Sequence, residues 1–114
     1  MKAETLKGHL DALVLAALRG RPAHGYAVIE ELKRRSEGAF DLAEGTVYPV
    51  LHRLEKDGHL SARRETAQGR SRVVYRLTAA GRKRLAASTA AWRRVVAGVN
   101  QVLLGEKHGS PAVT

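Results

Sequence analysis

The sequence predicts a mainly helical fold with one small β-hairpin and a long C-terminal helix. Three observations support this. Apolar residues recur at three- and four-residue spacing in four segments, the period changes to two over residues 72–77, and a polar, Gly-containing loop precedes that change. At 114 residues the chain has the usual size of one domain.

Two helices are expected in the first third of the chain. Apolar residues between positions 6 and 18 lie on one helical face, and the Gly-Arg-Pro sequence at 20–22 ends that segment. A second helix begins near His24, carries its apolar residues on one face, and ends in the basic run at 33–35 before Gly38. Tyr26, early in this helix, either binds a phosphate or packs between two helices.

A third helix is expected between about residues 44 and 56. Its apolar residues, from Val47 to Leu54, share one side, and basic residues occupy the other. Asp57-Gly58 ends the pattern. Pro49 falls inside this pattern, so it should lie in the first turn or kink the helix.

The hairpin follows the third helix. Val73, Tyr75 and Leu77 alternate with polar or outward positions, which predicts a half-buried strand whose Tyr75 lies in the core. Residues 60–66 supply a weaker partner strand, and residues 67–71 form the loop between them.

The final helix runs from about residue 79 to residue 104 and carries an apolar seam. The spacings along the seam are 7, 3, 4 and 3, and its residues are Leu85, Trp92, Val95, Val99 and Val102. One helix cannot bury such a seam alone, so we expect a second copy of the chain to cover it. Packing against the chain's own first helix is the alternative, and the two can occur on different faces.

The composition of the chain narrows the range of possible binding partners. Lys and Arg total 20 against 11 Asp and Glu, a formal charge of +9, which favours an anionic partner. A membrane surface is the weaker option, because the final helix has a narrow, valine-rich apolar face. The longest strongly apolar stretch, residues 13–18, is too short to span a bilayer, and we expect a cytoplasmic protein.

The sequence gives little support for a catalytic or metal-binding function. The chain has no cysteine, which excludes a disulfide framework, a zinc ribbon and a thiol nucleophile. It contains none of the common catalytic motifs, and its 5 histidines lack ligand spacing on a shared helix face. We therefore expect no enzyme, no catalytic or metal site and no cofactor.

The order helix, helix, helix, hairpin, long helix is that of a winged helix-turn-helix. We expect this DNA-binding domain over 1–78, a dimerisation helix over 79–104 and a flexible tail over 105–114. The hairpin region is rich in arginine and holds a single acid, Glu65, which suits a phosphate backbone or a narrow minor groove. In the third helix, Thr46 suits a thymine methyl group or a phosphate, Tyr48 a phosphate, and Arg53 a guanine or a phosphate.

Several motifs resemble the PadR family of regulators. They are Leu-Val-Leu-Ala-Ala-Leu at 13–18, His-Gly-Tyr-Ala-Val at 24–28, Gly-Thr-Val-Tyr-Pro-Val-Leu-His-Arg-Leu-Glu at 45–55 and Leu-Thr-Ala-Ala-Gly at 77–81. The resemblance covers about residues 6–104 and implies a homodimeric repressor, of the short subfamily with one C-terminal helix, that releases DNA on binding a small molecule. For such a dimer, whose two third helices enter successive major grooves, we expect a pseudo-palindromic operator. The resemblance also implies DNA contacts from the third helix and the wing. Carried over to this chain, these residues are Thr46, Tyr48, Pro49, His52, Arg53, Arg70 and Arg72.

Two alternatives stay open at this point. Trp92 is either a large anchor in the dimer core or, as in multidrug-binding relatives whose interface aromatics sandwich flat ligands, part of a pocket for an aromatic or drug-like effector. The alternative to a DNA-binding regulator is a protein-interaction module, in which the winged helix docks acidic proteins without binding specific DNA. Arginines at the hairpin tip, Arg70 and Arg72, favour DNA.

Overall fold

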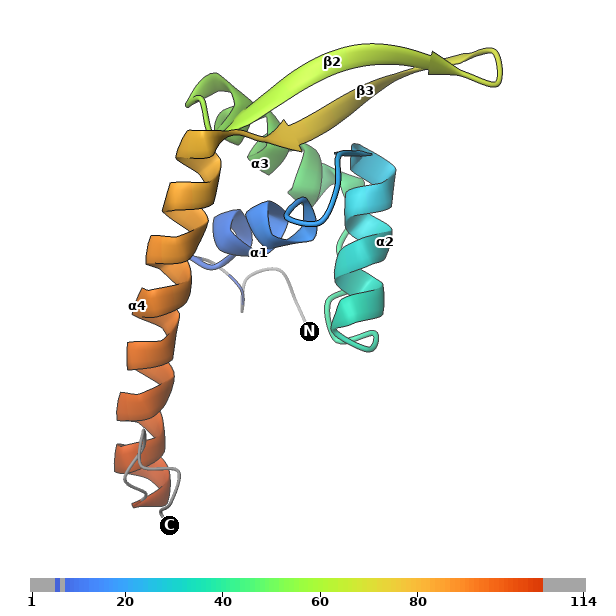
Figure 1. Cartoon of the computed structure of the whole chain (residues 1–114). Coiled ribbons are helices and arrows are strands. Elements are labelled where there is room, and N and C mark those ends of the chain that lie inside the picture. The colour runs from blue at the N-terminus through green and yellow to red at the C-terminus, as the bar shows by residue number, and fades with distance from the viewer. Residues whose placement is uncertain (1–5, 7, 106–114) are drawn as a thin grey trace.

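The computed structural model describes residue 6 and residues 8–105. The elements, in chain order, are α1 (Leu10–Ala17), β1 (Ala23–His24), α2 (Gly25–Arg35), α3 (Glu44–Lys56), β2 (Leu60–Ala67), β3 (Arg70–Leu77) and α4 (Ala79–Leu104). This arrangement confirms the mainly helical class with a small sheet and a long final helix (Figure 1). The predicted tail, apart from Gly105, lies outside the described residues.

The core forms where the first three helices meet the sheet. Val14 and Leu15 of α1, Val28 of α2, and Val47 and Leu51 of α3 are almost completely buried and belong to one apolar cluster. The sheet contributes Leu60 and Tyr75 to the same cluster, which confirms that Tyr75 points inward. Burial of these side chains is the main force that holds the helices together.

The sheet has the order β1-β3-β2, and all its pairs are antiparallel. The two-residue strand β1, which the sequence did not predict, pairs Ala23 with Tyr75. The hairpin turn is also tighter than the predicted five-residue loop. Its two residues, Gln68 and Gly69, have φ values of 53° and 76°. Positive φ at both positions is the signature of a two-residue type I′ turn.

The first turn of α4 lies directly against the turn that ends α3. The Thr78 hydroxyl accepts a hydrogen bond from the Gly81 amide at 3.0 Å and donates one to the Gly58 carbonyl at 2.7 Å. At Gly81, a Cβ atom would lie 2.0 Å from the carbonyl oxygen of His59, so this approach requires glycine. The start of α4 is therefore fixed to the winged domain by backbone contact.

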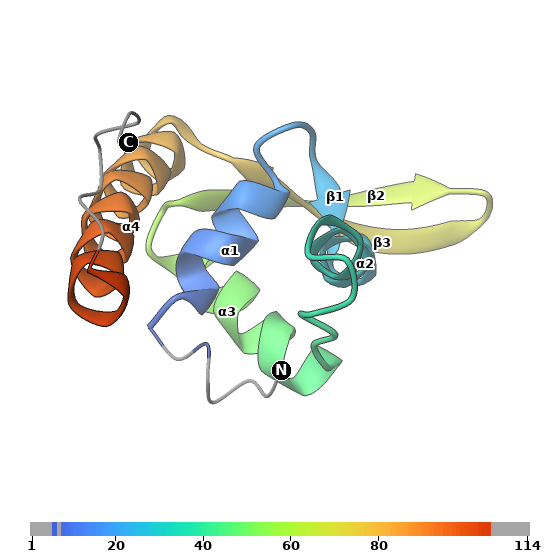
Figure 2. The ribbon, with the colours of Figure 1, turned by 90° about the horizontal axis from the view of Figure 1, so that it is seen from below.

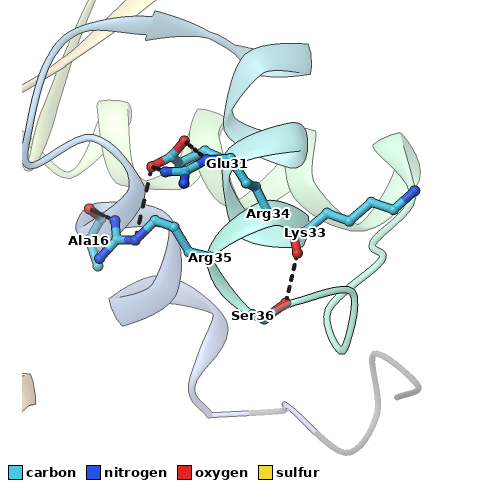
Figure 3. A network of polar contacts seen from close by, with 6 residues as sticks. All are labelled: Ala16, Glu31, Lys33, Arg34, Arg35 and Ser36. Carbon is cyan, nitrogen blue, oxygen red and sulfur yellow. Dashed lines mark hydrogen bonds and ion pairs between the residues drawn. The ribbon is translucent and has the colours of Figure 1, made fainter.

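Polar contacts at the end of α2 join it to α1 (Figure 3). Arg35 donates a hydrogen bond of 2.9 Å to the carbonyl of Ala16, which lies in the last turn of α1. Arg34 pairs with Glu31 on its own helix, with Nη2 and Oε2 2.8 Å apart, and Lys33 lies 3.9 Å from Asp41. All three cations of the basic run thus have partners inside the protein.

The molecule is elongated because two elements project from the core. Its principal dimensions are 55 × 28 × 22 Å and its radius of gyration is 16.3 Å, against about 13 Å for a compact domain of this length. The β2–β3 hairpin and α4 extend from opposite sides of the three-helix core (Figure 2).

Candidate nucleic-acid interface

One face of α3 is exposed to solvent. Gly45, Pro49, His52 and Lys56 recur at spacings of 4, 3 and 4 and are all exposed, so they form a single row along the helix. The buried residues Val47, Val50, Leu51 and Leu54 lie on the opposite side. We call these four exposed residues the outer row. Lys56 extends the row beyond the contacts that the sequence predicted.

Thr46 and Tyr48 lie on the flanks of this row. Both are half-buried. The Tyr48 ring covers the start of α2, since a Cβ atom on Gly25 would meet the ring at 2.4 Å. Gly25 is therefore needed to seat Tyr48 between α2 and α3, beside the outer row.

Pro49 lies within α3 and not in its first turn. It is the sixth residue of a helix that runs without interruption from Glu44 to Lys56. Because proline has no amide hydrogen, the carbonyl of Gly45 lacks its usual donor four residues on. Pro49 itself belongs to the exposed outer row.

The structure directs Arg53 away from the outer row. Its guanidinium forms an ion pair with Asp11 of α1, and the other carboxylate oxygen of Asp11 accepts a hydrogen bond of 2.7 Å from Arg84 of α4. Arg84 also lies 3.3 Å from Nδ1 of His59. The expected contact of Arg53 with guanine or phosphate thus has an intramolecular competitor. Sequence spacing gave no sign of it, because Asp11 lies 42 residues earlier.

The wing presents Arg70 at its tip. Arg70 is exposed, and it makes no ion pair or side-chain hydrogen bond with the described part of the chain. Farther along the hairpin, Arg64 donates to the Ser71 hydroxyl at 3.1 Å, and Arg76 pairs with Glu65 at 2.8 Å. A cation without a protein partner is the kind of group that a phosphate neutralises.

Arg72 links the wing to α2 through His24. Nδ1 of His24 accepts the Ala27 amide at 3.4 Å and so caps α2, while Nε2 lies 3.0 Å from Arg72. A neutral imidazole can accept at only one ring nitrogen, so these two contacts compete. Desolvation, and then the neighbouring Arg72 charge, lower the pKa of His24 below its usual value.

Tyr26 and Arg63 extend the exposed surface beyond the predicted set. Tyr26 is 55% exposed at the start of α2, so it does not seal two helices as one interpretation held. Arg63 is exposed on β2. The sequence left Tyr26 open between phosphate binding and helix packing. It placed Arg63 in the arginine-rich hairpin without naming it as a DNA contact.

The apolar seam of α4 divides into a buried base and an exposed continuation. Leu85 is 5% exposed and belongs to the protomer's own core, so its assignment to a dimer surface was wrong. Trp92, Val95, Val99 and Val102 are 45–83% exposed; we call them the α4 stripe. Trp92 also meets His9 edge-to-face, with ring centroids 5.0 Å apart. The first turns of the seam thus pack on the winged domain, and the remainder is uncovered.

The described part of the chain has neither a metal-binding cluster nor a membrane-spanning helix. Over residue 6 and residues 8–105, no group of three or more acidic or histidine side chains could hold a metal ion. Over the same residues, no helix combines the length and apolar character needed to cross a membrane.

Comparison with known proteins identifies the family. Residues 14–87 match the family described as "Transcriptional regulator PadR-like family". The chain is 41% identical, over 75% of its length and 74% of the relative's, to the transcriptional regulator Rv3488 of Mycobacterium tuberculosis.

Solved structures agree with this match. A PadR family transcriptional regulator from Eggerthella lenta is similar with a TM-score of 0.77 and 33% identity, covering 89% of this chain and 87% of that one. A transcriptional regulator from Clostridium thermocellum shares the fold, with a TM-score of 0.81, 22% identity, and coverage of 88% and 98%. The four-helix architecture, the wing and the matched residues together place this chain in the PadR-like family of DNA-binding transcriptional regulators.

Proposed function

We propose that this protein is a sequence-specific regulator that binds double-stranded DNA as a homodimer. The observation that carries the proposal is that each protomer presents two exposed elements, the outer row of α3 and the arginine-bearing wing. The same protomer leaves the α4 stripe uncovered. In a symmetric dimer joined along α4, two copies of α3 enter successive major grooves of a pseudo-palindromic site, with half-sites about 34 Å apart.

The roles of the side chains differ along this surface. Pro49 and His52 in the outer row are placed to meet base edges, and Lys56 at its end meets a phosphate. Thr46 and Tyr48 lie on the two flanks of the outer row and contact the sugar-phosphate backbone of the DNA. Arg70 and Arg72 bind phosphates beside the groove that α3 enters, with Arg72 leaving His24 to do so.

A salt series tests the roles of the wing arginines. Each lost phosphate contact should flatten the plot of log binding constant against log salt by about 0.9. The double variant Arg70→Ala with Arg72→Ala should therefore lower the slope by about 1.8 on any duplex. Arg34→Ala is the matched control, because Arg34 is an exposed arginine already paired with Glu31. An unchanged slope for the double variant contradicts the assignment of these residues as phosphate ligands.

Repression and release by a small molecule form the second part of the proposal. It is supported by the family membership and by Trp92, which is half-exposed on the α4 stripe beside His9. Because Trp92 is the chain's only tryptophan, a planar aromatic ligand bound there should quench its fluorescence saturably. A flat titration across a broad panel of such compounds contradicts a ligand site at Trp92 and leaves the residue as a dimer anchor.

The alternative is a module that docks acidic proteins through the same basic surface. It predicts no preference among DNA sequences and weak binding to any duplex at moderate salt. The exposed Arg70, unpartnered within the described chain, sits at the tip of a narrow two-stranded ribbon. This shape favours binding to DNA over docking on a flat protein surface, because a two-stranded ribbon fits into a DNA groove.

A further inference from the structure

A single carboxylate joins three helices in this protein. Asp11 lies in the first turn of α1. One of its oxygens pairs with Arg53 of α3, and the other accepts a 2.7 Å hydrogen bond from Arg84 of α4. The side chains of Asp11, Arg84 and Arg53 are 23%, 35% and 50% exposed. The cluster is thus partly shielded from solvent, where ionic contacts are screened less.

These three residues lie between the two parts of the molecule that DNA recognition must align. Arg53 flanks the outer row of α3, and Arg84 lies on α4, the helix that carries the exposed stripe. Besides apolar packing, one ion pair and one ring contact join α4 to the start of α1 within the described residues: the Asp11–Arg84 pair and the His9–Trp92 contact. The carboxylate is therefore the one ionic link in the described chain that touches both α3 and α4.

We propose that Asp11 is a positioning residue for operator recognition: by holding α3 and α4 together, it fixes the distance and angle between the two recognition helices of the dimer. This inference rests on the proposed function. It assigns Arg53 a structural role through Asp11 and removes it from the set of direct DNA contacts. It also predicts that Asp11 governs which half-site spacing is selected, while the wing governs overall affinity.

The sensitivity to spacing follows from DNA geometry. One added base pair moves the second half-site by about 3.4 Å along the helix axis and rotates it by about 34° around that axis. A dimer with a fixed α3-to-α4 angle cannot follow that displacement, so it loses base contacts in one half-site. A dimer whose α3-to-α4 angle is loose can follow it, at the cost of selectivity.

The test begins with sites selected from random duplexes by the unaltered protein. Binding is then measured on the selected site and on versions with one base pair added to or removed from its centre. The unaltered protein should lose at least tenfold in affinity on each altered site, since a mismatched contact commonly costs about that much. Asp11→Asn should reduce this discrimination to about threefold or less. Its salt slope on unrelated DNA should stay the same, because the proposed phosphate ligands Lys56, Arg70 and Arg72 are all untouched.

Three further variants sharpen the result. Arg84→Met removes the ion pair between Asp11 and α4 and should reduce spacing discrimination as much as Asp11→Asn does. The double variant, Asp11→Asn with Arg84→Met, should discriminate no less than either single variant. Glu31→Gln is the matched control. Glu31 is also a carboxylate that contacts two arginines, Arg34 and Arg35, but all three lie on α2. Glu31→Gln should keep the full discrimination.

A measurement without DNA separates positioning from general loss of stability. The chain has no cysteine, so spin labels can be attached at Glu44→Cys on α3 and Ala87→Cys on α4, both exposed positions. With labelled protein diluted in unlabelled protein, the distribution of distances between the labels should be narrow and should broaden in Asp11→Asn. Circular dichroism should show unchanged helix content in the same sample.

The outcomes are distinct. Equal weakening by Asp11→Asn on all three duplexes, with an unchanged label distribution, overturns the inference and reduces Asp11 to a stabilising ion pair. Selection that enriches no site with the unaltered protein refutes the proposed function, and the inference falls with it. An Arg53→Gln variant whose salt slope falls by about one unit shows that Arg53 binds phosphate, which also overturns the inference.

Discussion

Replacing Gly81 with alanine tests how α4 is attached to the winged domain. The added Cβ would lie 2.0 Å from the carbonyl oxygen of His59, whereas real Cβ atoms essentially never approach another heavy atom closer than 3.0 Å. Since both groups belong to backbone, α4 and the turn after α3 must separate by at least the difference, 1.0 Å. That movement strains the Thr78 hydrogen bonds to Gly58, at 2.7 Å, and to His59, at 3.2 Å.

The expected cost follows from these terms. Overpacking of this kind costs about 1–3 kcal/mol, and two weakened hydrogen bonds add about 1 kcal/mol each. Alanine returns about 1 kcal/mol through its higher helix propensity. We therefore expect Gly81→Ala to lower the free energy of unfolding by about 3 kcal/mol, and to lower Tm by about 12 °C at about 4 °C per kcal/mol.

The assay is thermal and urea unfolding followed by circular dichroism at one fixed protomer concentration, because a dimer's stability depends on concentration. Gly98→Ala is the matched control. Gly98 lies in the same helix, and a Cβ added there would have nothing within 4 Å, so the variant should gain up to about 1 kcal/mol. If Gly81→Ala loses less than about 1 kcal/mol, or behaves like Gly98→Ala, the close contact at the base of α4 is refuted.

The remaining predictions concern His24, the α4 stripe and Tyr48. The pKa of His24 is lowered in the folded state, so the folded protein favours the neutral imidazole. Neutral His24 therefore stabilises the fold in full above pH 6.5. This stabilisation is lost as the pH falls through the lowered pKa. The urea midpoint should therefore fall on acidification more in the unaltered protein than in His24→Asn, and equal falls would contradict this role. Val99→Glu should convert the proposed dimer to monomers in sedimentation at micromolar concentration, whereas Ala87→Glu, on another exposed face of α4, should remain dimeric; a dimeric Val99→Glu would place the interface elsewhere. Gly25→Ala should displace the Tyr48 ring and weaken specific DNA binding about tenfold or more, and unchanged affinity would show that the seat of Tyr48 does not matter for recognition.

The sequence was sufficient to predict the four helices, the two hairpin strands and their order, because each of these elements is specified locally. The two-residue strand β1 was not predicted, because it exists only through its pairing with β3. Helical periodicity in four segments and alternation at Val73, Tyr75 and Leu77 reflect burial of one face, which is a property of neighbouring residues. The α4 range, Ala79–Leu104, matches the expected 79–104 for the same reason. The two-strand hairpin was also correct, although its turn is two residues long because Gln68 and Gly69 both adopt positive φ.

The site was less predictable because it depends on contacts between distant residues. Arg53 looks like a free cation on a helix face until the fold brings Asp11 beside it. His24 looks like the start of a helix, and its contact with Arg72, 48 residues later, depends on the strand register. Leu85 fits the seam by spacing, yet it is buried in the protomer's own core. Tertiary packing decides each of these cases.

The most direct test of sequence-specific DNA binding by this protein is fluorescence anisotropy on two labelled duplexes of equal length across a salt series. One duplex carries the region upstream of the protein's own gene, and the other an unrelated sequence. We expect tighter binding to the upstream duplex by about 10³ or more, with a steep salt dependence on both. No binding to either duplex at low salt would contradict sequence-specific regulation and favour the module that docks acidic proteins.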